Sequence, residues 1–276
     1  MTNFCVALHH RGVISLQGED HYTLLQGLIT NDIHLLKEKG ILFTALLSPQ
    51  GRFLHDFFII EQDDILYLTP EKERTPDLLS LLQKHKLRSR VAIQDISDCM
   101  RLYAAWGGAC PSSFKIDPRL DQMGYLRLFP NDTCPEEQGS FEDYDRHRIM
   151  LAVPDGSRDL VIDKAIILEN NYHELHGISF EKGCYVGQEL MSRTHHRGLV
   201  RKRLMTVKIE GPLPPFGSAL FHQGVRMGTM KSSVGDVGLA LLQIDSVTIS
   251  LEAENGARVT KTSSAEPESN NPQALP

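Results

Sequence analysis

The chain has 276 residues, of which 41% are hydrophobic, and it carries a formal net charge of −6 at pH 7. This length is sufficient for two or three domains, each with a buried core. The acidic balance excludes a general electrostatic attraction to nucleic acid, and the lack of any apolar run of roughly 20 residues excludes a membrane-spanning helix.

The cysteines and the N-terminus both bear on the cellular compartment. The five cysteines are scattered and form no C-x-x-C pair, which argues against a disulfide framework and against a zinc ribbon. Residues 1–10 lack the basic segment and apolar core of a signal peptide, and they lack the Arg- and Ser-rich composition of a transit peptide. We therefore expect a cytoplasmic protein with reduced thiols.

Strands and helices alternate over the first 106 residues. The pattern predicts strands at 4–8, 13–16, 41–47, 53–60, 65–68, 91–96 and 101–106. It also predicts a helix that ends near Ile29 and another over 75–86, with Thr75 as N-cap and Pro76 as the first helical residue. Ser48-Pro-Gln-Gly51 fits a type I turn. This alternation is typical of an α+β core.

The middle and the end of the chain differ in composition and in the secondary structure that they predict. Residues 107–140 are rich in loop-forming residues around one predicted strand at 124–129, and helices are predicted at 144–149 and 164–176. Short strands separated by glycine turns then predict a small all-β module, with strands at 199–209, 219–222, 225–230 and 237–242. The polar end lacks apolar surface. We therefore expect a first region at 1–198, a β-module at 199–253 and a disordered tail at 254–276.

The stretch Lys182-Gly-Cys-Tyr-Val-Gly-Gln-Glu189 joins a loop to a predicted helix. Residues 188–195 are good helix formers, and Gly198 ends the run. Cys184 is thus expected on a tight loop before a helix N-terminus, two residues from Lys182, and both influences favour its thiolate. The alternative is an inert thiol that packs as a small hydrophobe.

This stretch resembles the signature of the YgfZ family of folate-binding proteins, and Arg193-Thr-His-His-Arg-Gly198 extends the match. These proteins are bacterial relatives of a mitochondrial iron–sulfur cluster assembly factor and of the glycine-cleavage T-protein, an aminomethyltransferase. Further similarity covers most of residues 10–205. The resemblance implies an α+β, T-protein-like fold, in which a folate-binding N-terminal region of two interleaved α+β domains meets a C-terminal β-barrel.

The resemblance also implies a function. The chain would be a tetrahydrofolate-binding accessory factor in iron–sulfur cluster assembly or repair, supporting cluster enzymes that include tRNA-modifying ones. Its partners would be a folate and iron–sulfur proteins, and Cys184 would act as a redox-active or transiently ligating thiolate. A folate-dependent one-carbon transferase and a tRNA-binding module are the alternatives. We expect no metal site at His195 and His196, because adjacent helical residues point about 100° apart.

The same resemblance suggests which residues hold the folate. Glu169 matches the pterin-binding carboxylate of the T-protein, and the alternative is a solvated helix residue. Asp56 matches one of two acidic residues beside the reactive folate nitrogen, but His55 replaces the other, which weakens the case for aminomethyl transfer. Asn31 is expected to line the pocket and Tyr185 to form a wall against the rings. For the segment around Asn31 the alternative is that Asp32 only caps a helix, and for Tyr185 the alternative is plain core packing.

Five cations lie within eleven residues: Arg193, Arg197, Arg201, Lys202 and Arg203. The glutamyl tail of a folate is anionic and binds Arg or Lys, so we expect Arg193 and Arg197 to help hold it. A solvated helix end or an RNA-phosphate site are the alternatives, although no aromatic-rich RNA signature accompanies the run.

Overall fold

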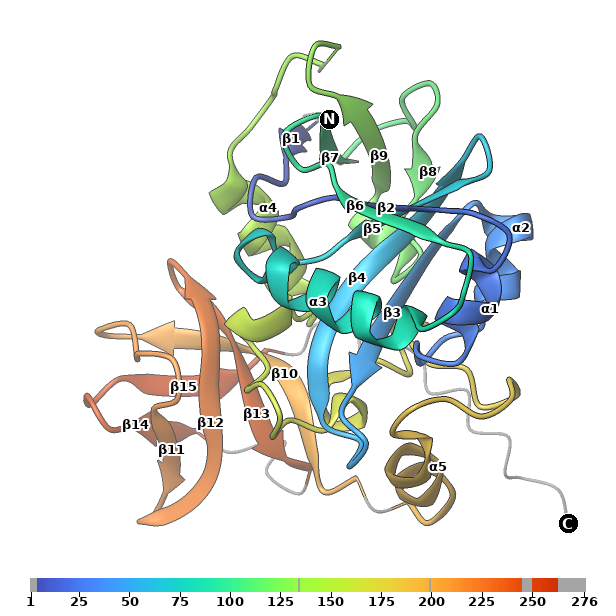
Figure 1. Cartoon of the computed structure of the whole chain (residues 1–276). Coiled ribbons are helices and arrows are strands. Elements are labelled where there is room, and N and C mark those ends of the chain that lie inside the picture. Colours follow the sequence, from blue (N-terminus) through green and yellow to red (C-terminus); the bar gives the residue numbers. More distant parts are fainter. Residues whose placement is uncertain (1–3, 134, 199, 245–249, 263–276) are drawn as a thin grey trace, which may run out of the picture.

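Strands form three sheets within residues 4–133, 135–198, 200–244 and 250–262, which the computed structural model describes (Figure 1). The first sheet, of order β3-β4-β5-β2-β6, consists of β2 (Ile14–Gln17), β3 (Ile41–Leu47), β4 (Phe53–Gln62), β5 (Ile65–Thr69) and β6 (Ala92–Asp95). The second, of order β1-β7-β9-β8, consists of β1 (Phe4–Ala7), β7 (Met100–Trp106), β8 (Lys115–Ile116) and β9 (Tyr125–Pro130). The third is a closed barrel, β10-β13-β12-β11-β14-β15, made of β10 (Lys202–Glu210), β11 (Ala219–His222), β12 (Val225–Val234), β13 (Val237–Gln243), β14 (Leu251–Ala253) and β15 (Arg258–Lys261).

Helices are fewer than strands in the described residues. The α-helices in the described ranges are α1 (His21–Gln26), α2 (Leu36–Lys39), α3 (Thr75–Lys86), α4 (Phe141–Met150) and α5 (Gln188–His196). The 3-10 helices there are η1 (Ile33–Leu35), η2 (Lys72–Arg74), η3 (Asp121–Met123), η4 (Gly156–Arg158) and η5 (Ile167–Asn170). None of these described helices has the length and apolar character needed to cross a membrane.

The five-stranded sheet is covered on both faces, which explains why all seven residues of β3 are buried. Leu42 and Leu46 pack in a core that includes residues of α1 and α3, and Figure 1 shows α3 lying across this sheet. Phe43 and Ala45 point the other way, into a core shared with the four-stranded sheet. Since successive strand residues point to opposite faces, one apolar strand serves both cores.

The barrel joins the rest of the molecule through α4 (Figure 1). Ile149 packs against barrel residues, and its carbonyl oxygen accepts a hydrogen bond from the Thr206 hydroxyl at 2.6 Å. Arg148 is fully buried, pairs with Asp145 and Asp159, and donates to the Ser232 hydroxyl at 2.6 Å. A buried charge that is fully hydrogen-bonded in this way fixes one arrangement of α4 on the barrel.

The predicted α+β class with a C-terminal barrel is confirmed. The strand at 41–47 and the helix at 75–86 match their predictions. The helix begins one residue before its expected start, however, because η2 precedes it and the Thr75 hydroxyl donates to the Glu71 carbonyl oxygen instead of capping. Helix α1 ends at Gln26, earlier than expected.

Two predictions differ from the structure. The helix expected at 164–176 is only the short η5, because Asn171 adopts a left-handed conformation (φ +63°) and its amide donates to carbonyl oxygens elsewhere in the chain. The tail predicted from residue 254 begins too early, because β15 pairs with β10 and closes the barrel. Residues 263–276 of that tail lie outside the described residues. The division of the chain at residue 198 stays a prediction.

Candidate functional site

A buried lysine anchors the loop of residues 179–187. Lys182 is only 7% exposed, and its ammonium donates hydrogen bonds to the carbonyl oxygens of Gln26 at 2.7 Å, Ile29 at 2.8 Å and Asn31 at 2.8 Å. The Gln26 carbonyl lies at the C-terminal end of α1, where helical carbonyl groups lack intrahelical partners, and the other two lie in the segment that follows. The Lys182 ammonium is therefore directed into the fold, and its expected influence on Cys184 stays a prediction.

The second glycine of the signature packs against the turn between β3 and β4. Gly187 has φ +82°, and a Cβ at this position would lie 2.6 Å from the carbonyl oxygen of Ser48 and 3.0 Å from the Cα of Gly51. Any side chain there would force the two segments apart, so only glycine fits. Helix α5 starts at the next residue, Gln188, as predicted, and ends one residue later than expected, at His196.

Cys184 lies exposed on this anchored loop. The loop is also bonded along its backbone: the amide of Ser179 donates to the Thr30 carbonyl oxygen at 3.0 Å, and the amide of Val186 donates to that of Gly27 at 3.2 Å. The thiol is therefore presented from a segment that is fixed before and after it. Cys99 and Cys110 are exposed as well, but neither belongs to the signature.

Histidine and phenylalanine rings tie the loop to α5. The rings of Phe180 and His195 stack with centroids 4.0 Å apart, and the ring of His173 lies 4.9 Å from that of His195. Burial, then the neighbouring His173 and His196, lowers the pKa of His195, so this ring is neutral at physiological pH. No three His, Cys, Asp or Glu side chains in the described ranges are grouped so as to hold a metal ion.

Asp56 does not face a ligand site. It is 1% exposed, and its carboxylate accepts hydrogen bonds from Arg11 at 2.9 Å and from the Tyr172 hydroxyl at 2.8 Å, and from the amide of Gly156 at 3.2 Å. Its folate-binding role is therefore corrected to a structural one, because both oxygens are already bonded within the fold. The adjacent His55 points to the other face of β4 and is also buried.

Asn31 is likewise committed to the fold. It is 3% exposed, and its amide donates to the backbone oxygens of Phe43 at 2.8 Å and His176 at 2.7 Å. With both amide hydrogens used, it cannot donate to a ligand, and the pocket-lining role is corrected. Tyr185 is buried in the core below the Lys182 ammonium, and its hydroxyl has no hydrogen-bond partner among the described residues. Burial raises the pKa of Tyr185 to about 12.

Glu169 lies at the junction of η5 with the barrel, and it is half-buried. Burial raises its pKa, and the cations Lys202, Arg52 and Lys231 oppose that rise. Lys231 is itself buried in β12, and its ammonium lies 5.1 Å from the centroid of the Phe216 ring. Neither Arg52 nor Lys231 was expected at this site from the sequence, since both are distant from Glu169 in the chain.

The side chain of Asn170, next to Glu169, is also buried at this junction. Its Oδ1 atom has no hydrogen-bond partner within the described ranges, although its amide nitrogen donates to the carbonyl oxygen of Ile166 at 2.9 Å. A buried acceptor of this kind is costly unless water or a ligand bonds to it. The junction therefore contains a carboxylate, three cations and an unused acceptor.

The basic run does not form one continuous patch. Arg193 pairs with Glu189 at 3.0 Å on α5, and Arg203 pairs with Glu174 at 2.9 Å. Arg193 and Arg197 also line a shallow cavity of about 430 Å³ on the exposed face of α5. Of the five cations, Lys202 is the one that acts on Glu169.

Comparisons with known proteins place these features in context. Residues 201–265 match the C-terminal beta-barrel domain of CAF17. The chain is 35% identical over 75% of its length to the mitochondrial iron-sulfur cluster assembly factor IBA57 homolog of Mycosarcoma maydis, of which it spans 58%. It is 32% identical over 94% of its length to the mitochondrial iron-sulfur cluster assembly factor IBA57 of Homo sapiens, of which it spans 83%.

A solved structure shares the fold. The glycine cleavage system aminomethyltransferase T from Bartonella henselae superposes with a TM-score of 0.72 over 95% of this chain and 85% of its own, at 13% identity. The T-protein-like fold is therefore confirmed. The expectation of a cytoplasmic location is contradicted, because the relatives are named as mitochondrial proteins.

Proposed function

Because this chain belongs to the family of the IBA57 iron–sulfur cluster assembly factors, we propose that it acts in iron–sulfur cluster assembly and that Cys184 is its cluster-contacting residue. The cluster is the cargo, and its iron is bound by the thiolate sulfur. When that bond forms, the thiol proton is released to solvent, because only the thiolate ligates. Iron–sulfur proteins are accordingly the proposed partners.

The exposure of Cys184 on a fixed loop is the observation that supports this role. Lys182 and Gly187 hold the loop on either side, so little conformational freedom is lost when the sulfur binds iron. The stack of His195 on Phe180 also holds α5 against this loop.

We further propose that the chain binds tetrahydrofolate at the junction around Glu169, as in the YgfZ-type folate-binding proteins that its signature resembles. The carboxylate accepts from the donors on the pterin edge, and the nearby Arg52, Lys202 and Lys231 oppose the rise of its pKa that burial causes. Arg193 and Arg197 remain the residues that we propose for the anionic glutamyl tail. The unused Oδ1 of Asn170 offers a further acceptor. When bound, a tetrahydrofolate supplies a reduced pterin that can carry a one-carbon unit.

The alternatives have weaker support. A T-protein-type transferase needs a carboxylate beside the folate, and Asp56 is occupied by Arg11 and Tyr172. A tRNA-binding module needs a continuous basic surface, and the ion pairs of Arg193 and Arg203 interrupt it. We therefore propose that support of tRNA-modifying enzymes is indirect, through their clusters.

The cluster role is tested in cells that lack this protein. We expect Cys184→Ser to leave the activity of a [4Fe–4S] enzyme at the level of the empty strain, while Cys110→Ser restores it. Cys110 is the matched control, because it is an exposed thiol outside the signature. Full restoration by Cys184→Ser would refute the role of the thiol.

The folate role is tested by calorimetric titration with tetrahydrofolate. We expect the wild type to bind tetrahydrofolate saturably and Glu169→Gln to bind it at least about tenfold more weakly. The control Glu181→Gln, which alters an exposed carboxylate, should bind like the wild type. No heat of binding with folded wild-type protein would refute folate binding. Turnover of an aminomethylated carrier by this complex would favour the transferase instead.

A further inference from the structure

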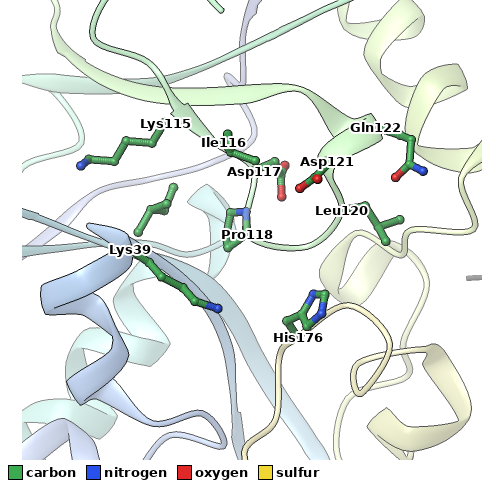
Figure 2. Close-up of a pocket in the computed structure, with 10 residues that line it drawn as sticks. Lys39, Lys115, Ile116, Asp117, Pro118, Leu120, Asp121, Gln122 and His176 are labelled. Carbon is green, nitrogen blue, oxygen red and sulfur yellow. The ribbon is translucent and has the colours of Figure 1, made fainter. Parts of the chain in front are cut away.

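A cavity of about 600 Å³ opens where the end of α2, strand β8, the loop after β8 and the segment before Gly177 meet (Figure 2). Its lining residues are Lys39, Ile41, Lys115, Ile116, Asp117, Pro118, Leu120, Asp121, Gln122 and His176. The volume is that of a small-molecule site. Neither Cys184 nor Glu169 lines it, so the proposed function does not use it.

One wall is fixed by a buried ion pair. Arg119 is 1% exposed and donates to both carboxylate oxygens of Asp117, at 3.0 and 2.7 Å, and to the Tyr144 hydroxyl at 3.0 Å. Its guanidinium also lies 4.7 Å from the centroid of the Phe58 ring. This wall is therefore formed before any ligand arrives, and the charge of Asp117 is already neutralised.

The opposite wall is held by His176. Its backbone is left-handed, with φ +53°, and its carbonyl oxygen accepts from the Asn31 amide at 2.7 Å. The ring Nδ1 lies 3.3 Å from the carbonyl oxygen of Arg119. Because a carbonyl oxygen only accepts, Nδ1 carries the hydrogen in this contact, which fixes the orientation of the ring.

Two ammonium groups give the cavity a positive charge. Lys39 and Lys115 make no ion pair with any described residue, and Figure 2 shows the Lys39 ammonium directed toward the side where His176 lies. The Lys115 ammonium packs over Gly40, where a Cβ would lie 2.2 Å from Nζ. Since Asp117 is neutralised, Asp121 is the remaining carboxylate of the lining, and the cavity is positive in a chain of net charge −6.

We infer that this cavity binds a small organic anion, namely an apolar or aromatic body that carries a carboxylate or a phosphate. The two lysines attract the anionic group. Ile41, Pro118 and Leu120 offer apolar surface to the body, and Ile116, which is 55% exposed, loses that exposure when the body binds. A cation with the same body is repelled.

The test uses methyl NMR of the isoleucine-labelled full chain, with benzoate and phenyl phosphate as probes. We expect the signals of Ile41 and Ile116 to shift saturably with at least one probe, while Ile209 in the barrel core stays unchanged. Benzylamine, which has the same body and the opposite charge, should leave all three signals in place. Binding of one probe alone would identify the anionic group that the cavity prefers.

Charge removal provides the decisive comparison. The double variant Lys39→Ala/Lys115→Ala should weaken binding of the anion about tenfold, because the attraction of both ammonium groups is lost. The control Lys37→Ala/Lys84→Ala removes the same charge elsewhere and should bind as the wild type. The inference is overturned if neither anion shifts Ile41 and Ile116, if benzylamine binds equally well, or if the double variant binds unchanged with an otherwise native spectrum.

Discussion

The loop of residues 179–187 and the surroundings of Asp56 both contain a buried charge, yet they leave different groups at the surface. Around Asp56 each oxygen accepts from another part of the fold, and nothing reactive remains exposed. In the loop, the charge of Lys182 is bonded to backbone carbonyls, and Cys184 stays exposed beside it. Buried charges near a candidate site can therefore fix the chain and leave an exposed neighbour, here Cys184, available for the proposed contact with a cluster.

Removal of the buried carboxylate should have the largest effect on stability. Asp56→Ala removes one of the two carboxylates that pair with the buried Arg11 guanidinium and leaves the buried Tyr172 hydroxyl without its acceptor. We expect a loss of about 3–5 kcal/mol in the free energy of unfolding in urea. The control Asp98→Ala changes an exposed carboxylate and should cost less than about 0.5 kcal/mol. If Asp56→Ala cost no more than Asp98→Ala, Asp56 would not be structural, and the contrast with the loop would be lost.

The residue before Asp56 should make the stability of this region pH-dependent. Burial, then the nearby Arg74, lowers the pKa of His55 to about 4, below its usual value of 6.5. The stability that neutral His55 contributes is complete above pH 6.5 and is lost as the pH falls through 4. Wild type should therefore lose about 3 kcal/mol more than His55→Gln between pH 7.5 and pH 4. Parallel pH profiles of the two proteins would show that His55 is accessible to solvent.

Substitution of the two glycines of the signature by alanine should have different costs in stability, although the two positions are only four residues apart. Gly187→Ala places a Cβ against the Ser48 carbonyl oxygen at a positive φ, and we expect a cost of about 2 kcal/mol. Gly183 has no neighbouring heavy atom within 4 Å of an added Cβ, so Gly183→Ala should cost less than about 0.5 kcal/mol. Urea unfolding of the two variants measures the difference. Equal costs would mean that the loop is not anchored at Gly187.

The smallest effect on stability is expected at the thiol itself. Cys184→Ser should change the free energy of unfolding by less than about 0.5 kcal/mol, because the side chain is exposed. The same variant should fail in the cell-based assay, so stability and function separate at this residue. A loss above about 1 kcal/mol would mean that the sulfur packs inside the fold, and it would contradict the exposed position on which the proposed role of Cys184 depends.

Local sequence patterns predicted the strands and helices well where the residues within the element determine where it begins and ends. The strand β3, in which six of the seven residues are apolar, and the start of α5 after Gly187 follow from periodicity and from glycine. The prediction of a helix at 164–176 was wrong, because the Asn171 side chain donates to distant carbonyl oxygens and the backbone of Asn171 is left-handed. The strand β15 was not predicted, because its own sequence has little apolar character and its burial comes from pairing with the distant β10.

The candidate site depended more on contacts that are distant in sequence. The exposed loop position of Cys184 was predictable, since it lies between two glycines before a helix. The burial of Asp56 was not, because Arg11 and Tyr172 reach it from 45 and 116 residues away. The same holds for Lys231, which only the fold brings to Glu169.

The central claim is that Cys184 contacts the cluster, and its labelling by iodoacetamide tests this most directly. The protein is incubated anaerobically with iron, sulfide and a reductant, and labelling of Cys184 and Cys110 is followed by mass spectrometry. Our account predicts that both thiols are labelled in the metal-free protein and that the cluster slows labelling of Cys184 about tenfold or more, while Cys110 is unaffected. Equal labelling of Cys184 with and without a bound cluster would contradict it.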